Sequence, residues 1–315
     1  MALCTRLTFI VLRVVCFAMP APEARGRFRT TVPILRRDRS DDGRIANAFR
    51  KLRQMSIHIA RILQRLLSSF GANASRTIAG HRFYFDASTD IGRSLLVTGQ
   101  FERHALGQCS RFIKNDGVVI DVGANVGVHT VHFAHCAPSG RVISIEPSRS
   151  TLQYLLRNIA HLVNVVPLNV ALSDTTGIKN FFVASDNAYS GLKDTKRKTI
   201  LHEEAVACFT GDEILLPLCA NRRVDFIKID VEGLELQVLR GLRAIISRHR
   251  PVIFCEIFGG EQSNPDPEAT VRYCTSLGYE AFALSGKEIV PSRSHDDRLY
   301  NYFFIPTPVE CASHN

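Results

Sequence analysis

Short apolar runs alternate with helical repeats along most of this chain. Runs rich in Val, Ile, Leu and Phe, typical of buried strands, occur at residues 118–120, 141–146, 165–172, 224–230 and 251–257. Between these runs, apolar residues recur at helical spacing, at positions 152, 155, 156 and 159 and again at 234, 238, 239, 242 and 245. Strands that alternate with helices predict an α/β, doubly wound fold, in which helices cover both faces of a mostly parallel sheet.

The stretch from Val118 to Ala134 predicts a buried strand, a glycine turn and the start of a helix. Asp121 follows the apolar run at the strand's carboxyl end, where open parallel sheets bind ligands. Gly123 and Gly127 permit a tight turn, but Asn125 stands where the dinucleotide fingerprint needs its middle glycine. A ligand without phosphates, such as S-adenosylmethionine, does not need that glycine, and Asn tolerates a left-handed backbone. The turn therefore favours S-adenosylmethionine over NAD or FAD, although a turn that serves packing alone has the same pattern.

Two further strand ends predict contacts to the same ligand. Glu146 ends the second strand, 25 residues after Asp121. In a doubly wound sheet this places it beside the glycine turn, where a carboxylate accepts hydrogen bonds from both ribose hydroxyls. The alternative is an acid in a solvated loop. Ser173 and Asp174 end the third strand and are placed to meet an adenine edge. Ser150 is positioned to cap the helix that begins after it, with apolar residues at 152–159.

Several motifs in order resemble the FkbM-type S-adenosylmethionine-dependent methyltransferases. They are DVGANVGVHT (121–130), IEP (145–147), NVALSD (169–174), FIKIDVEGLELQVLRG (226–241) and RPVIFCE (250–256), with a weaker match at TGQFE (98–102). The resemblance covers about residues 95–260. It implies a class I methyltransferase (Rossmann-like) fold with a seven-stranded sheet in the order 3-2-1-4-5-7-6, whose antiparallel last strand falls at residues 300–305. It also implies O-methylation of a sugar, glycolipid or other secondary metabolite.

The resemblance carries over to individual residues of the cofactor site. Residues 187–192 are implied to form a loop near the cofactor, and His129 matches a family position near it. The full implied set for cofactor binding is Asp121, Gly123, Ala124, Asn125, Gly127, His129, Glu146, Ser173 and Asp174. His129, His132 and His135 repeat every three residues, but the rotation between them disfavours a three-histidine metal site, so we expect no metal.

Chemistry selects candidate catalytic residues near the fourth strand. A sulfonium methyl is already activated, so the enzyme must align the reactants and remove one proton from an alcohol. Asp230 and Glu232 are the candidate bases, with Lys228 on the same face as Asp230. Glu256, at the end of the fifth strand, is a further candidate. Under the alternative, structural interpretation, Lys228 and Asp230 form only an ion pair, and Glu235 stabilises a helix dipole.

Charge and composition divide the chain. Residues 1–76 carry fifteen Lys and Arg against four Asp and Glu, a net charge of +11, whereas residues 77–315 have a net charge of −2. The basic excess therefore lies outside the predicted catalytic domain, and we expect no nucleic-acid partner. The nine cysteines contain no Cys-x-x-Cys pair, which suits a cytoplasmic protein without a zinc site.

The predicted domains are a basic, disordered arm (1–44), an amphipathic helix (45–76), the methyltransferase domain (77–310) and a tail (311–315). Apolar residues mark one face of the helix at residues 45–70, and arginines mark the other. This helix either packs on the domain or lies on a membrane surface and contacts lipid-linked substrates. Two other functions remain open. The missing middle glycine disfavours a nicotinamide-dependent oxidoreductase, and the intact acids disfavour a non-catalytic cofactor-binding protein.

Overall fold

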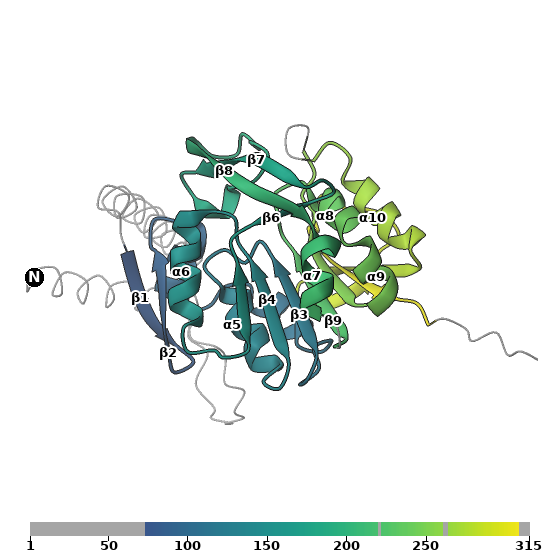
Figure 1. Ribbon diagram of the computed structural model, residues 1–315, viewed down its shortest axis with the longest axis horizontal. Helices are drawn as coiled ribbons and strands as arrows, with labels where there is room; N and C mark the ends of the chain where they lie inside the picture. The colour runs from purple at the N-terminus through teal and green to yellow at the C-terminus, as the bar shows by residue number, and fades with distance from the viewer. Residues whose placement is uncertain (1–72, 220–221, 261–263, 309–315) are drawn as a thin grey trace, which may run out of the picture. The chain divides into compact units, whose positions relative to one another are not determined.

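The computed structural model describes residues 73–219, 222–260 and 264–308. Their largest feature is a sheet of eight strands in the order β12-β11-β13-β10-β9-β3-β4-β5 (Figure 1). Strands β5, β4, β3, β9 and β10 are mutually parallel, while β13 is antiparallel to both β10 and β11. The strand bounds are β3 (Val118–Val122), β4 (Arg141–Ile145), β5 (Val165–Leu168), β9 (Val224–Ile229), β10 (Val252–Glu256), β11 (Tyr279–Ser285), β12 (Glu288–Pro291) and β13 (Asn301–Pro306).

This topology confirms the predicted class I fold and strand order. When β12 is left aside and the other seven strands are numbered along the chain, they follow the order 3-2-1-4-5-7-6, and the last of them, β13, is antiparallel as expected. The sheet differs from the expectation by its eighth strand, because β12 forms a tight hairpin with β11 and extends the edge, with Ser285 paired to Glu288.

The predicted third strand at 165–172 is wrong beyond Leu168. Asn169 donates its side-chain amide to the carbonyl oxygens of Glu146 and Pro147, both at 2.9 Å, and the central sheet ends there. The chain then forms β6 (Ala171–Ser173), which joins β7 (Gly177–Ala184) and β8 (Ile200–Thr210) in a second sheet of order β6-β8-β7. The sequence pattern missed β7 and β8 because the first half of each strand is mostly exposed and lacks a continuous apolar run.

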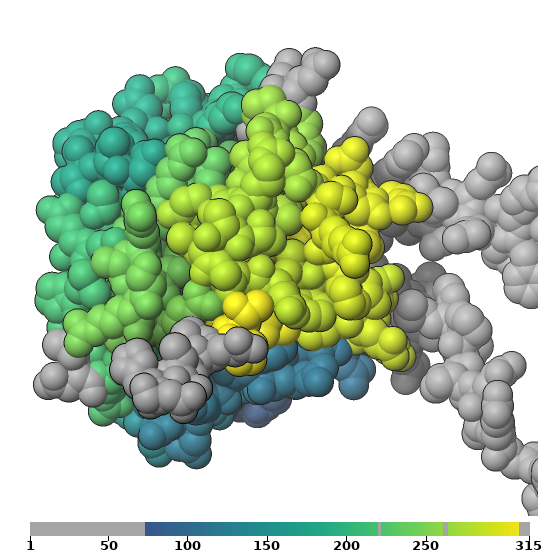
Figure 2. All heavy atoms as spheres, turned by 90° about the vertical axis from the view of Figure 1, so that its right-hand side faces the viewer, coloured from purple at the N-terminus to yellow at the C-terminus, as the bar shows by residue number. Residues whose placement is uncertain are grey.

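Helices cover both faces of the central sheet, as predicted. Because neighbouring strand residues point to opposite faces, Val118 and Ile120 pack with one group of helices and Val119 with the other. The first group is α7 (Gly211–Cys219), α8 (Glu235–Gly241), α9 (Arg243–His249) and α10 (Pro267–Ser276). The second includes α4 (Arg103–Cys109) and α5 (Val128–Cys136). The carboxyl-terminal elements, yellow-green to yellow, form most of the surface in Figure 2.

Two helix predictions need correction. The helix predicted at 234–246 is two helices, α8 and α9, which meet at the fully buried Leu242. A Cβ on the preceding Gly241 would lie 2.1 Å from the carbonyl oxygen of Ser173, so this glycine allows α8 to approach β6 closely. The helix after the second strand, α6 (Arg149–Ile159), has Ser148 as its N-cap residue instead of Ser150.

The chain before β3 adds a hairpin and two helices that the sequence pattern did not predict. The hairpin consists of β1 (Asn73–Ile78) and β2 (His81–Asp86), and β1 crosses the domain boundary predicted at residue 76. It leads into α3 (Asp90–Thr98). The basic arm and the helix predicted at 45–70 lie outside the described residues, so the domain division stays a prediction. Within residues 73–308, apart from the two gaps, no helix is long and apolar enough to cross a membrane.

Candidate active site

A cavity of about 430 Å³ lies at the carboxyl ends of the central parallel strands. The ends of β3, β4, β9 and β10 contribute Gly123, Glu146, Asp230 and Glu256 to its lining. Parallel sheets bind their ligands at this edge. Residues 187–192, which the resemblance placed near the cofactor, also line the cavity.

The glycine turn after β3 is built from left-handed residues. Gly123, Asn125 and Gly127 have φ angles of 76°, 51° and 89°, so the expectation that Asn125 adopts this conformation is confirmed. A Cβ on Gly123 would lie 1.9 Å from the carbonyl oxygen of Asp230, which follows β9. Packing therefore requires glycine at position 123, whether or not a ligand is bound.

Glu146 lies beside this turn, as predicted, and it is buried instead of solvated. Its Oε2 accepts a hydrogen bond from the Asn125 backbone N–H and its Oε1 accepts one from the Ser148 N–H, both at 2.9 Å. Burial raises the pKa of Glu146 to about 7. The carboxylate thus holds the turn in place and also lines the cavity.

A buried cluster of charges supports the floor of the site. The Nζ of Lys228 donates to the carbonyl oxygen of Gly123 at 2.7 Å, and it lies 3.2 Å from Asp230 Oδ2 and 3.6 Å from Asp121 Oδ1. Burial opposes the charge of Lys228, but Asp230 and Asp121 raise its pKa. Thr130 donates to Asp121 Oδ2 at 2.6 Å. Asp121 and Lys228 do not line the cavity, so both act by positioning the residues that do.

Besides Asp90 and Glu146, four acids line the cavity, and the sequence singled out three of them. Asp230 has a partly exposed side chain. Glu232 accepts a hydrogen bond from Arg197 Nη1 at 2.7 Å and has a left-handed φ of 58°. Burial, followed by the charge of Asp230, raises the pKa of Glu232 to about 8. Burial and the charges of its acidic neighbours raise the pKa of Glu256 well above its usual range. Glu256 therefore holds its proton more readily than an ordinary carboxyl.

Glu102 is the fourth acid, and sequence analysis gave it no role. Its Oε2 lies 3.2 Å from His129 Nε2. Burial opposes its ionisation, but the His129 imidazole lowers the pKa of Glu102. His129 itself does not line the cavity, so it orients Glu102. The motif TGQFE, which ends at this residue, carried the only signal for it.

Besides Asp121 and His129, four predicted cofactor residues do not line the cavity: Ala124, Gly127, Ser173 and Asp174. Ala124 and Gly127 belong to the turn but face the packed side, where a Cβ on Gly127 would lie 2.6 Å from Leu155. The hydroxyl of Ser173 contacts Asp174 and Lys179 instead of the cavity. The expectation that Ser173 and Asp174 meet an adenine edge is not supported, because β6 leaves the central sheet. Ala171 and Leu172 line the cavity in their place.

Aromatic residues and an arginine form another part of the cavity wall. The Arg197 guanidinium lies over two rings, 4.4 Å from the Tyr189 centroid and 4.6 Å from that of Phe258. Phe258 in turn stacks on Tyr300, with 4.6 Å between centroids. Sequence analysis missed this group because its members come from distant segments.

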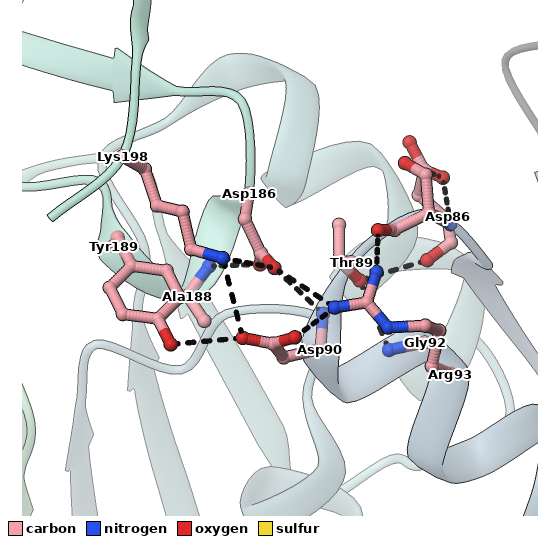
Figure 3. A network of polar contacts seen from close by, with 10 residues as sticks. Asp86, Thr89, Asp90, Gly92, Arg93, Asp186, Ala188, Tyr189 and Lys198 are labelled. Atoms are coloured by element: carbon pink, nitrogen blue, oxygen red, sulfur yellow. Dashed lines mark hydrogen bonds and ion pairs between the residues drawn. The ribbon is translucent and has the colours of Figure 1, made fainter. Parts of the chain in front are cut away.

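A polar network fastens the loop at the cavity to α3 (Figure 3). Asp186 Oδ2 accepts a hydrogen bond from the Asp90 backbone N–H at 2.8 Å, and Tyr189 donates to Asp90 Oδ2 at 2.9 Å. Arg93 pairs with Asp90 and lies 3.8 Å from Asp186, while Lys198 lies within 4.0 Å of both acids. The network therefore joins two parts of the cavity wall that are about a hundred residues apart in the chain.

The sheet order, with a cavity at the carboxyl edge of the parallel strands, is that of the class I methyltransferase fold. The methyltransferase FkbM domain matches residues 121–281, and the chain belongs to this family. The relatives that match are methyltransferases, which favours S-adenosylmethionine as the cofactor and disfavours the alternative of a nicotinamide-dependent oxidoreductase.

Individual relatives match over part of their length. The chain is 31% identical over 130 residues to the hexuronic acid methyltransferase AglP of Haloferax volcanii, covering 41% of this chain and 51% of AglP. It is 24% identical over 200 residues to methyltransferase sdnD of Sordaria araneosa, covering 54% of this chain and 76% of that protein. The crystal structure of an FkbM methyltransferase from Methylobacillus flagellatus aligns with a TM-score of 0.41 at 18% identity, covering 66% of this chain and 46% of that one. The chain thus spans about half the length of AglP.

Proposed function

We propose that this protein transfers a methyl group from S-adenosylmethionine to a hydroxyl of a small acceptor, such as a sugar, a glycolipid or another secondary metabolite. The observation that supports this most strongly is the position of the acids. Glu146 follows β4 on one side of β3, and Asp230, Glu232 and Glu256 follow β9 and β10 on the other. One side suits the ribose of the cofactor, and the other suits removal of a hydroxyl proton.

The residues at the glycine turn fit the cofactor. Glu146 has the carboxylate that accepts hydrogen bonds from a ribose diol, and the turn, held by this carboxylate, presents Gly123 and Asn125 to the cavity. The bound cofactor supplies an activated methyl group. The chain's residues bind the acceptor, align its hydroxyl and accept its proton.

Asp230 or Glu232 is the proposed base for the hydroxyl proton. Both line the cavity, and Lys228 holds Asp230 in place from the buried side. With a pKa of about 8, Glu232 gains the proton-accepting form as the pH rises through that value. Burial raises the pKa of Glu256, and the role proposed for this residue is to hold its proton and donate a hydrogen bond to the acceptor.

A sugar acceptor is supported by the wall of the cavity and by one relative. The stacked rings of Phe258 and Tyr300 present apolar surface, and Arg197 presents hydrogen-bond donors beside it. A hexuronic acid, for which the relative AglP is named, is a sugar that such a wall suits. We further propose a cytoplasmic location, with residues 45–70 as the segment that contacts a membrane surface if the acceptor is lipid-linked.

An acceptor panel tests this proposal. The purified chain is given S-adenosylmethionine with neutral sugars, uronic acids and glycolipids, and S-adenosylhomocysteine is measured. We expect S-adenosylhomocysteine to form faster with at least one class of hydroxyl-bearing acceptor than it does without an acceptor. Formation only with amines or thiols would contradict the proposal.

Replacing Glu146 tests the cofactor assignment. We expect Glu146→Ala to weaken S-adenosylmethionine binding by about 1.5–3 kcal/mol, because it removes charge-assisted hydrogen bonds to the ribose. Calorimetric titration measures the affinity, and circular dichroism confirms the fold. The control is Glu288→Ala, which removes an exposed glutamate from the edge strand β12. Unchanged affinity for S-adenosylmethionine in a folded Glu146→Ala protein would show that Glu146 does not bind the ribose.

The pH dependence of turnover tests Glu232. If it is the base, kcat rises with pH through about 8, because a raised pKa keeps the carboxyl protonated below that value. Arg197→Gln removes a nearby positive charge that lowers the pKa, so the rising limb should move to higher pH. The comparison is a kcat profile of both proteins from pH 6 to 10. If the rising limb of kcat lies at the same pH in the parent and in Arg197→Gln, Glu232 is excluded as the base and Asp230 is favoured.

A further inference from the structure

Three histidines far apart in the sequence converge away from the cavity. His81 begins β2, His135 lies in the last turn of α5, and His161 follows α6. One nitrogen from each ring lies within 4.8 Å of one from each of the other two. The His81 ring stacks on His161 with 4.3 Å between centroids and lies 5.2 Å from His135. Figure 1 shows β2, α5 and α6, which carry or adjoin these residues, on the same side of the sheet.

We propose that His81, His135 and His161 bind a divalent transition metal, with Zn²⁺ as the ion that their chemistry suits best. Three imidazoles and one open position make a tetrahedral zinc site, and imidazole is also a ligand of Cu²⁺ and Ni²⁺. The histidines that sequence analysis considered together, 129, 132 and 135, do not form this group. Only His135 belongs to it.

The hydrogen bond of His135 prepares its ring for metal binding. Its Nδ1 lies 2.7 Å from the carbonyl oxygen of Val131. Because a carbonyl oxygen can only accept, Nδ1 carries the hydrogen, and in the neutral ring Nε2 holds the free lone pair. Metal-binding histidines commonly have their second nitrogen fixed in this way. Among the described residues, no protein hydrogen bond occupies the ring nitrogens of His81 or His161.

The surroundings leave room for an ion. Zn–N bonds of about 2.0–2.1 Å place tetrahedral ligand atoms about 3.4 Å apart, so rotation of the exposed His161 ring, with the His135 ring held by Val131, closes the site. His81 lies on the same face of β2 as the buried Phe83 and Phe85, so its backbone is anchored by the core. The adjacent cations, Arg82 and Arg157, both lie over the Tyr84 ring, at 5.9 and 6.0 Å.

Metal binding here would reinforce one wall of the cavity. The side chain of Asn158 already joins α6 to β2, through hydrogen bonds of 2.7 and 2.8 Å to the backbone of Tyr84. A metal would add α5 to that link. The hairpin continues into α3, which contributes Asp90, Ile91 and Ser94 to the cavity lining. The expected effect is therefore on stability, independent of the methyl-transfer step.

Titration of Zn²⁺ into the untagged full chain, stripped with EDTA and dialysed, tests the site. We expect one high-affinity Zn²⁺ per chain, and a melting temperature higher by about 5 °C at a hundredfold excess over Kd. His135→Gln and His161→Gln should each weaken binding at least ~10-fold. The matched control is His132→Gln, on the same helix, because His132 bonds Ser110 at 2.7 Å instead of joining the group. In EDTA, all variants should melt as the parent does.

Two results would overturn the proposal. One is the absence of Zn²⁺ binding by the parent chain, or binding that His135→Gln and His161→Gln leave unchanged. The other is loss of binding in His132→Gln with normal binding in His135→Gln, which would place the metal beside His132 and Cys136, whose Nε2 and Sγ lie 3.7 Å apart.

Discussion

Gly123→Val abolishes S-adenosylmethionine binding in this account, and it lowers stability as well. The valine Cβ would lie 1.9 Å from the carbonyl oxygen of Asp230, a backbone atom that cannot move without displacing the end of β9. The φ of 76° adds strain, because a β-branched residue rarely adopts a left-handed conformation. Calorimetric titration should detect no binding at cofactor concentrations that saturate the parent protein.

A second glycine separates backbone strain from the steric clash. Gly286 also has a left-handed φ, of 62°, but a Cβ there meets nothing within 4 Å. We expect Gly286→Val to lose about 1–2 kcal/mol of stability and to keep its cofactor affinity. If Gly123→Val binds as tightly as the parent, the turn does not form the cofactor site.

Removal of the catalytic base gives the other large effect. Asp230→Asn or Glu232→Gln should lower kcat by at least about 10², which is the lower end of what a positioned general base contributes. Both substitutions keep the side chain's shape and one oxygen acceptor, so Lys228 and Arg197 keep a partner. Cofactor affinity should stay within a few-fold of the parent value. The measurement is kcat on the acceptor found in the panel, together with a titration of the cofactor.

One of the two variants should account for most of the loss. If both retain near-normal turnover, the proton leaves by another route, and the next candidate is Glu102. The His129 imidazole lowers the pKa of Glu102, which favours its proton-accepting form, whereas burial raises the pKa of Glu256. Glu102→Gln would then show the loss that we expect of Asp230→Asn or Glu232→Gln.

The fold was predictable where strands are buried on both faces. Strands such as β3 and β9 are buried along their whole length, so they appear as continuous apolar runs. Strands β7, β8 and β12 were missed because they are partly exposed, which leaves a weaker apolar pattern. The end of β5 was misjudged because a side chain, that of Asn169, ends the strand through contacts to a distant loop.

The candidate site was predictable only where it follows a strand end. Glu146 and Asp230 come directly after buried strands and Glu256 ends one, so their meeting at one edge of the sheet followed from the chain order. Arg197 and Phe258 belong to loops, and no periodicity indicates that they meet. The pKa of Glu232 was equally hidden, because it depends on burial and on the charge of a neighbour.

Transfer of a labelled methyl group into a total extract of polar lipids and polysaccharides tests the central claim most directly. The parent protein should label a product whose methyl group survives mild alkali and is recovered on a sugar or other alcohol as a methyl ether. Gly123→Val should label nothing under the same conditions. Label lost in mild alkali as a methyl ester, or label recovered on nitrogen, would contradict the proposal that this methyltransferase acts on a hydroxyl.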